Sequence, residues 1–216
     1  MEGASVRQFK IVCVFCGTSL GKGEEFVKAA DNLGRVLAER KLHLVYRGGS
    51  LRLMGCVSTA AHVGGSEVVG IIPKALSTGN ITGKTVGGEL IVLTMHERIA
   101  KMLDFAYAFI ALPGGFGTLE EIFQIASWAQ LTIHQKPIGL LNVNGFFNKL
   151  LSFLDHAVEQ NFISQTTGKL LISASTADEL INQLQNFVHE PDPTMARLEW
   201  STESSKKRKL DLSLRL

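Results

Sequence analysis

Short apolar runs alternate with longer amphipathic stretches through most of this chain. The runs have the length of buried strands, and the stretches carry apolar residues at helical spacing. Such alternation is typical of a parallel sheet whose two faces are both covered by helices, so we expect an α/β fold of this kind. The expected strands are residues 11–15, 42–46, 68–72, 90–93, 108–112 and 138–141. The expected helices are residues 24–39, 51–63, 95–105, 119–131, 146–159 and 176–188.

The length of 216 residues suits one domain, because a single hydrophobic core can grow to about 250–300 residues before it divides. We expect one α/β domain over residues 1–190 and a polar, flexible tail over residues 191–216. The net charge of +2 is concentrated in this tail, which from Ser201 onward carries five basic and two acidic residues. The domain itself is nearly neutral. Because nucleic-acid backbones bind clustered Lys and Arg, we expect no nucleic-acid partner.

Three further features bear on location. The N-terminus lacks the apolar stretch of a signal peptide, and no run reaches the roughly 18 apolar residues of a membrane span, so we expect no membrane partner. Three cysteines form no disulfide framework in a chain of this length, which indicates a reducing compartment. The run Lys206-Lys207-Arg208-Lys209 fits a nuclear import signal, although such short runs are more often only solubilising. We expect the cytoplasm, with some entry into the nucleus.

The strongest motif is Pro113-Gly114-Gly115-Phe116-Gly117-Thr118, which follows an expected strand and opens an expected helix. Three glycines in four positions allow the backbone to approach a ligand closely, and the helix start offers free N–H groups and a positive dipole end. These properties suit a phosphate. A second interpretation is a tight turn in which Thr118 is the N-cap and Glu121 completes a capping box. Both can hold at once, with Glu121 at the rim of the anion site.

Two other loops and one helix start are expected at the same edge of the sheet. Gly48-Gly49-Ser50 and Cys16-Gly17-Thr18-Ser19 each follow an expected strand, although a plain turn is at least as good an interpretation of the second loop. Thr94 and Glu97 form a capping box that begins a helix and places Arg98 in its first turn. A guanidinium suits phosphate recognition. Because the carboxyl ends of parallel strands meet at one edge, these groups should share one crevice.

Three other sequence patterns do not indicate a functional site. Cys13 and Cys16 have redox or metal-ligand spacing, but positions three apart on a strand lie on opposite faces, so we expect core thiols. Residues 79–85 resemble a phosphate-loop motif but have three residues between the glycines instead of four. The six histidines show no metal-ligand spacing. We therefore expect no metal.

These motifs are similar to those of the LONELY GUY family, plant-type cytokinin riboside 5′-monophosphate phosphoribohydrolases whose relatives were once labelled lysine decarboxylases. The family signature P-G-G-x-G-T-x-x-E stands here at residues 113–121, and residues 94–98, 128–131 and 139–143 extend the likeness. The resemblance implies a Rossmann-like, nucleotide-binding domain that assembles as a homodimer or larger oligomer. It also implies hydrolysis of the bond between an N6-substituted adenine and its ribose 5′-monophosphate, without a metal or organic cofactor.

The resemblance also implies roles for individual residues. Glu121 would be the catalytic carboxylate and Arg98 its partner, since breaking an N-glycosidic bond builds positive charge on the ribose. The phosphate would be held by Gly114, Gly115, Gly117 and Thr118. The remaining candidates for substrate binding are Ser19, Gly49, Ser50, Asn80, Ile99, Phe116, Leu119 and Glu120.

This chain departs from the family pattern at four positions. Arg47 and Arg52 stand where the family usually has glycines, Ile99 where it has lysine, and Asn80 where it has glutamate. An arginine that replaces a glycine at positive φ costs about 1–2 kcal/mol. Two interpretations therefore stay open: an active phosphoribohydrolase, or a nucleotide-binding or weakly active homologue without efficient turnover.

Two expected helices carry more apolar surface than one face of a sheet can cover. Helices that are apolar over most of their surface are usually covered on several sides. Together with the resemblance, this predicts a homodimer joined through these two helices. The residues concerned are Met95, Ile99, Met102 and Leu103 in one helix and Ile122, Phe123, Ile125, Ala126 and Trp128 in the other.

Overall fold

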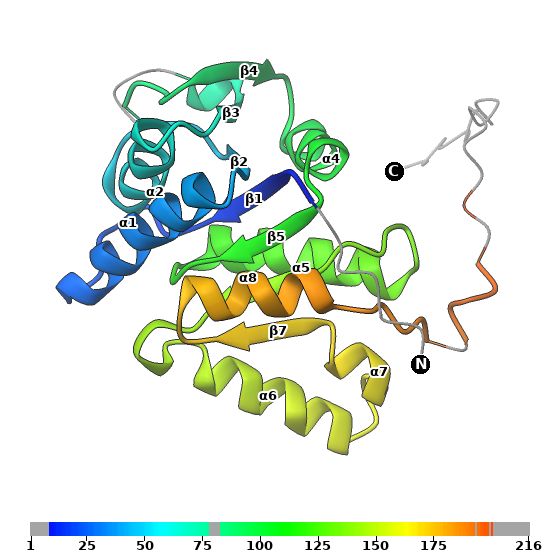
Figure 1. Ribbon diagram of the computed structural model, residues 1–216. Coiled ribbons are helices and arrows are strands. Elements are labelled where there is room, and N and C mark those ends of the chain that lie inside the picture. The colour runs from blue at the N-terminus through cyan, green and yellow to red at the C-terminus, as the bar shows by residue number, and fades with distance from the viewer. Residues whose placement is uncertain (1–8, 78–82, 193, 199, 201–216) are drawn as a thin grey trace, which may run out of the picture.

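A computed structural model describes residues 9–77, 83–192, 194–198 and 200, which form a seven-stranded parallel sheet (Figure 1). The strand order is β4-β3-β2-β1-β5-β6-β7, so the chain runs outward from the central strand β1 and then returns to its other side. A reversal of this kind opens a crevice at the carboxyl ends of the middle strands. The strands are β1 Ile11–Phe15, β2 His43–Tyr46, β3 Val68–Pro73, β4 Gly88–Val92, β5 Ala108–Ala111, β6 Ile138–Leu141 and β7 Leu171–Ala174.

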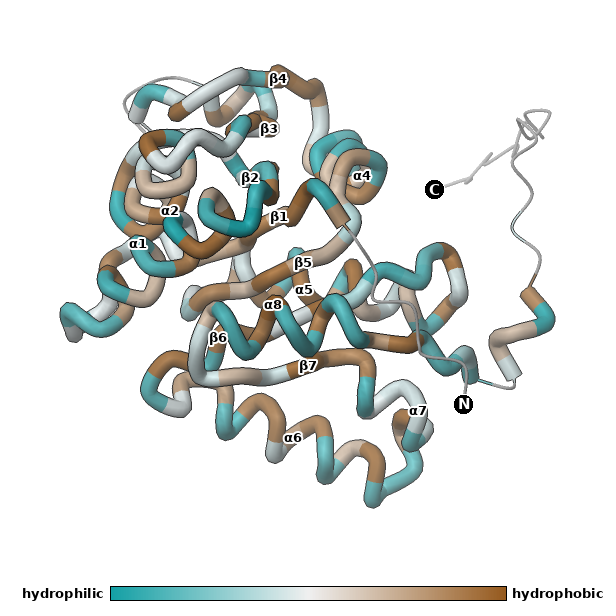
Figure 2. Tube along the Cα trace, in the orientation of Figure 1, coloured by the Kyte–Doolittle hydropathy of each residue, from teal (hydrophilic) through white to brown (hydrophobic). Residues whose placement is uncertain are grey.

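Helices cover both faces of this sheet, which confirms the expected fold class. One face packs against α1, α2 and α8, and the other against α4, α5 and α6. Figure 1 shows α8 in front of the sheet and α5 behind it, and Figure 2 shows helices whose hydropathy alternates along the chain beside largely hydrophobic strands. The helices are α1 Glu24–Glu39, α2 Arg52–Val63, α4 Met95–Phe105, α5 Phe116–Gln130, α6 Asn148–Glu159, α7 Gln165–Gly168 and α8 Ala177–Asn186, with 3-10 turns at Lys74–Leu76 and Val143–Gly145.

The central strand β1 divides its side chains between two buried layers. Val12 and Val14 belong to the layer under α1 and α2, whereas Cys13 and Phe15 belong to the opposite layer. Cys16, just beyond the strand, returns to the first layer. Cys13 and Cys16 therefore lie on opposite faces, as expected, and burial raises the pKa of the Cys16 thiol to about 12. Both are unreactive core residues.

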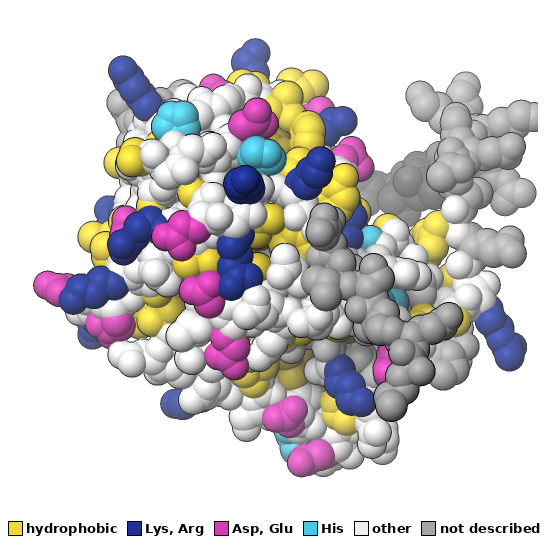
Figure 3. Space-filling model, viewed as in Figure 1, with side chains coloured by type: hydrophobic (Ala, Val, Ile, Leu, Met, Phe, Trp, Pro, Cys, Tyr) yellow, Lys and Arg dark blue, Asp and Glu magenta, His cyan; other side chains and the backbone are white. Residues whose placement is uncertain are grey.

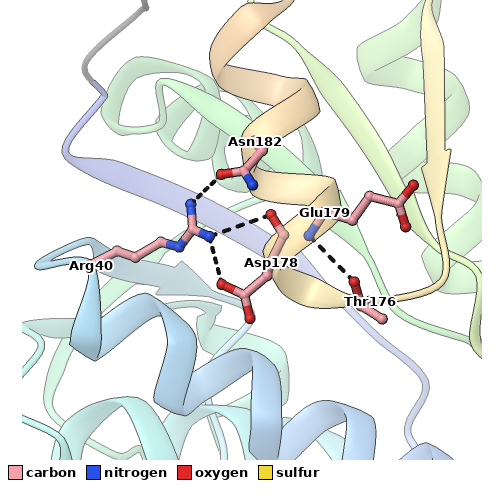
Figure 4. Close-up of polar contacts among 5 residues, drawn as sticks. All are labelled: Arg40, Thr176, Asp178, Glu179 and Asn182. Atoms are coloured by element: carbon pink, nitrogen blue, oxygen red, sulfur yellow. Dashed lines mark hydrogen bonds and ion pairs between the residues drawn. The ribbon is translucent and has the colours of Figure 1, made fainter.

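A polar contact fastens the first helix to the last one (Figure 4). Arg40, the C-cap of α1, donates to Asn182 Oδ1 at 2.6 Å and to Asp178 Oδ1 at 2.5 Å on α8. Thr176 caps the start of α8 by accepting from the backbone N–H of Glu179 at 3.3 Å. Because the ion pair is partly exposed, it contributes at most about 1 kcal/mol. It orients α8 against α1 more than it stabilises the fold.

Most expected boundaries are correct to within one or two residues, but α5 begins at Phe116, three residues earlier than expected. The strand β7 and the short helix α7 were not expected. No helix within the described ranges is both long and apolar enough to span a membrane. On the face in Figure 3, basic and acidic side chains are interspersed. The basic run at residues 206–209 lies outside the described residues.

Candidate active site

Three loops meet at the carboxyl edge of the sheet, as the sequence predicts. The loop after β1 is tied to the loop after β5, because the backbone N–H of Gly17 donates to the carbonyl oxygen of Pro113 at 3.0 Å. Arg47 follows β2 directly, and its Nη1 atom would lie 3.1 Å from a Cβ atom added to Gly117. The loops at residues 48–50 and 113–118 therefore open on one shared region.

Two cavities adjoin in this region and share Thr18. The first, of about 290 Å³, is bordered by the loop glycines and by apolar side chains. The second, of about 240 Å³, contains three arginines: Arg47, Arg52 and Arg98. The first cavity is lined by Gly17, Thr18, Ser19, Leu20, Gly21, Phe26, Leu53, Pro113, Gly114, Gly115 and Phe146. The second cavity is also lined by apolar side chains, so each cavity combines polar or charged groups with apolar surface, which suits a ligand with an aromatic part and an anionic part.

Glu121 is buried between two guanidinium groups, both of which line the second cavity. Arg98 Nη2 donates to Glu121 Oε1 at 2.7 Å, and Arg47 Nη1 donates to Glu121 Oε2 at 3.2 Å. The Glu121 side chain is 1% exposed, that of Arg98 is 4% exposed and that of Arg47 is 16% exposed. Two positive charges thus face one negative charge in a nearly water-free position.

Burial and charge act against each other at this cluster. Burial raises the pKa of the Glu121 carboxyl above its ordinary value, and Arg47 and Arg98 oppose that rise. Burial likewise lowers the pKa of Arg98, which the charge of Glu121 counteracts. Desolvation makes a buried ion pair a weak source of stability. Its presence at a cavity is more often associated with function.

Two buried polar atoms at the site have no hydrogen-bond partner among the described residues. They are Nε of Arg98 and Oγ1 of Thr118. Because nearly all buried polar atoms in proteins are hydrogen-bonded, these two atoms can still accept or donate a hydrogen bond to water or to a ligand. The start of α5 is also without a side-chain cap, because its N-cap residue is Gly115. The first N–H groups of a helix have no partner within the helix and attract anions.

The expected capping box at Thr118 and Glu121 is wrong. Thr118 lies inside the first turn of α5, and the carboxylate of Glu121 pairs with arginines instead of with the backbone. Glu121 is also fully buried and lines neither cavity, so it does not lie at the rim of the site. The N-cap expected at Thr94 is confirmed, because Glu97 N donates to Thr94 Oγ1 at 3.0 Å, but the Glu97 side chain accepts from the backbone N–H of Leu93 at 2.7 Å instead of from that of Thr94. This cap fixes the first turn from which Arg98 reaches Glu121.

The other candidate residues differ in position. Ser19, Ser50, Phe116 and Glu120 are exposed near the loops, Phe116 at 94%, and Gly49 is buried with a φ of +83°. Leu119 is half-buried against the core. Asn80 lies outside the described residues.

Ile99 does not belong to the candidate site. It is 2% exposed and packs in the core layer under α4, so a lysine there would be buried among apolar side chains. Arg52 has the expected strain, with a φ of +61°. The contact between Arg47 and Glu121 was not predicted. The sequence feature that could have predicted this contact is an arginine directly after a strand, at the edge where the glycine loop also opens.

Comparison with known proteins gives a consistent result. A family model described as possible lysine decarboxylase matches residues 54–184. Cytokinin riboside 5′-monophosphate phosphoribohydrolase LOG7 of Arabidopsis thaliana is 51% identical over 193 residues, covering 89% of each chain. LOG3 of the same plant, with the same activity in its name, is 49% identical over 202 residues and covers 94% of each chain.

Solved structures share the fold at lower similarity. A molybdenum cofactor binding protein from Rippkaea orientalis is 21% identical with a TM-score of 0.62, covering 82% of this chain and 96% of the other. The molybdenum cofactor carrier protein of Chlamydomonas reinhardtii is 18% identical with a TM-score of 0.61, covering 82% and 98%. At this identity the likeness establishes the Rossmann-like architecture alone.

Proposed function

The chain belongs to the family of cytokinin riboside 5′-monophosphate phosphoribohydrolases, and we propose that it performs the reaction for which its relatives are named. In that reaction water cleaves the bond between base and ribose, giving free cytokinin and ribose 5-phosphate. The observation that supports this most directly is the buried pair of Arg98 and Glu121 beside a glycine-rich helix start. Arg47 and Arg52 stand where the family pattern has glycines, but the contact between Arg98 and Glu121 is still present.

The phosphate of the substrate would bind at the start of α5. Gly115 has open space where a side chain would project, so a ligand can approach the backbone there. The helix dipole and the unsatisfied hydroxyl of Thr118 favour an anion with several acceptor oxygens. Binding energy from the phosphate, which does not react, would position the sugar over the carboxylate.

Glu121 would act on the sugar. Cleavage moves the bonding electrons onto the base nitrogen and leaves positive charge on the ribose, which an adjacent carboxylate stabilises. Water supplies a hydroxyl group to the ribose carbon, and its remaining proton ends on the base. Arg98 would act through Glu121, because its hydrogen bond favours the ionised carboxylate against the effect of burial.

We further propose a homodimer formed through α4 and α5. The two helices cover the same face of the sheet, and several apolar side chains on and beside them remain exposed: Leu93 at 77%, Met95 at 45% and Phe123 at 36%. Neighbouring exposed apolar residues on a soluble enzyme commonly mark an interface.

Base release from defined substrates tests the activity. Purified protein is incubated with isopentenyladenosine 5′-monophosphate, with AMP and with free isopentenyladenosine, and the released base is quantified by chromatography. We expect release from the cytokinin monophosphate well above that from the riboside. Binding of the monophosphate without any release of base, by wild type and by Glu121→Gln alike, would instead establish a nucleotide-binding protein.

A further inference from the structure

The second cavity carries more positive charge than its neighbouring carboxylate balances. Arg47, Arg52 and Arg98 line it, and no acidic side chain lines it in the described part of the chain. Glu121 pairs with Arg47 and Arg98 from a buried position beside the cavity. One carboxylate thus stands against three guanidinium groups, so the cavity attracts anions.

The helix α2 begins at this cavity and adds to its positive potential. Its N-cap Leu51 and its first residue Arg52 both line the cavity. No described side chain caps this helix start, and its first turn has no acidic residue. The first N–H groups of a helix have no partner within the helix and attract anions. An arginine at the same helix start adds a second positive group, which is unfavourable unless an anion balances both.

Arg52 occupies its position against a backbone cost. Its φ of +61° lies in the left-handed region, which residues with a side chain adopt only with strain. The residue is exposed and makes no hydrogen bond or ion pair with any described residue. Neither packing nor pairing within the described ranges therefore explains an arginine where the family pattern has a glycine.

Two other arginines connect the second cavity with the expected phosphate position. Arg47 lines the cavity, and its Nη1 atom would lie 3.1 Å from a Cβ atom on Gly117, in the first turn of α5. Arg98 is 4% exposed, and its Nε has no hydrogen-bond partner among the described residues, so it can donate to a ligand. Thr18 lines both cavities. The starts of α5 and α2 thus form two adjacent anion sites, with Arg47 beside both.

We propose that the second cavity binds a second phosphate group, so that this chain binds nucleoside 5′-diphosphates more tightly than 5′-monophosphates. The first phosphate lies at the start of α5, and the second, joined to it through a bridging oxygen, lies between Arg47 and Arg52 at the start of α2. The inference rests on the proposed function for the nucleoside and for the position of the first phosphate. A terminal phosphate offers three acceptor oxygens, which guanidinium groups bind in pairs.

Calorimetry with isopentenyladenosine 5′-monophosphate and 5′-diphosphate tests the preference. Divalent cations are left out, because they would neutralise the phosphates. Wild type should bind the diphosphate about tenfold or more tightly than the monophosphate, as expected from one additional charge-assisted hydrogen bond. Arg52→Gly should lower the affinity for the diphosphate about tenfold and that for the monophosphate much less. Because glycine adopts the positive φ at position 52 without strain, this variant should fold at least as well as wild type.

Arg35→Ala is the matched control. It removes one positive charge from an exposed position on α1 that lines neither cavity. The wild-type preference for the diphosphate should persist in this variant. Equal affinity of wild type for both nucleotides, or equal loss of preference in Arg52→Gly and Arg35→Ala, overturns the proposal. Inorganic phosphate that binds beside the monophosphate, without any preference for the diphosphate, also overturns it, because the two phosphates are then not joined.

Base release in the same samples separates this inference from the proposed function. A preference for the diphosphate that depends on Arg52, with no base released from either nucleotide, would reject the phosphoribohydrolase activity and retain the second phosphate site. Release of base from the monophosphate, with no tighter binding of the diphosphate, would retain the activity and reject the site. A crystal structure with the diphosphate should show its terminal phosphate hydrogen-bonded to Arg52, and a terminal phosphate directed into solvent would reject the site whatever the activity.

Discussion

Gly114 and Thr118 lie so close together that a Cβ atom on Gly114 would stand 2.2 Å from Thr118 Oγ1. It would also stand 2.8 Å from the backbone nitrogen of Gly17. The next residue, Gly115, has nothing within 4 Å of the corresponding position. Two adjacent glycines of one motif are therefore needed for different reasons, the first for packing between loops and the second for access of a ligand.

Substituting alanine at each position tests the packing role and the ligand-access role separately. Gly114→Ala overpacks the junction of two loops and should destabilise the protein by about 1–3 kcal/mol, measured by urea unfolding. Gly115→Ala should leave the free energy of unfolding nearly unchanged, because its φ of −98° is open to any residue, and should weaken binding of the monophosphate. Equal effects of the two substitutions on stability would contradict this distinction.

Removal of the charge on Glu121 should affect both turnover and stability. Glu121→Gln should lower base release by about 10²–10⁴-fold, the usual scale for loss of a catalytic carboxylate. It should also lower the free energy of unfolding by about 3–5 kcal/mol, because the buried Arg98 and the partly buried Arg47 lose their counter-charge. The double variant with Arg47→Gly should recover part of that stability but none of the turnover. Glu120→Gln, an exposed neighbour, should change stability by less than about 0.5 kcal/mol.

His134 should make stability depend on pH. Its Nε2 lies 2.9 Å from the carbonyl oxygen of Ile125, and its Nδ1 accepts from the backbone N–H of Lys136 at 3.1 Å, so the neutral ring satisfies both contacts. Burial lowers the pKa of His134 from 6.5 to about 4. Since the folded pKa is depressed, this contribution is fully present above pH 6.5 and is lost as pH falls through about 4.

Urea unfolding between pH 7.5 and pH 4 measures this contribution, which should be about 3 kcal/mol at neutral pH. In His134→Gln the ring no longer titrates, so the difference in stability between wild type and variant should shrink toward acid pH. A difference that stays constant over this range would mean that folding does not shift the pKa of His134.

The assembly prediction can be tested by light scattering at micromolar concentration. Wild type should be a dimer, and Leu93→Glu, which places a charge beside α4, should be a monomer with unchanged secondary structure. Phe162→Glu is the control, because Phe162 is 86% exposed after α6, away from the expected interface. A monomeric wild type, or equal dissociation by both variants, would refute an interface at α4 and α5.

Local sequence patterns were sufficient for most of the fold and for part of the site. The central strands are apolar on both faces and stand out from the helices between them. The edge strand β7 does not stand out in this way. Its residues Leu171, Ile172 and Ser173 are only half-buried and form no continuous apolar run. Arg98 was predictable because the cap at Thr94 fixes its place in the helix.

The features of the site that the sequence did not predict depend on tertiary packing. Thr118 is a residue type common at N-caps, yet here the backbone of Gly115 begins α5 and the threonine is buried in the first turn. The contact of Arg47 with Glu121 joins residues 74 positions apart. Its geometry depends on how far a long side chain extends across the sheet edge, which no local pattern specifies.

The central place of β1 also matters while the protein is being synthesised. The chain emerges N-terminus first, so β1 to β4 can assemble early, while the second edge of β1 stays open until β5 emerges. Arg47 and Arg98 also emerge before their common counter-charge, and Glu121 follows Arg98 by 23 residues. At translation rates of about 5–20 residues per second, about 1–5 seconds pass between the synthesis of Arg98 and that of Glu121.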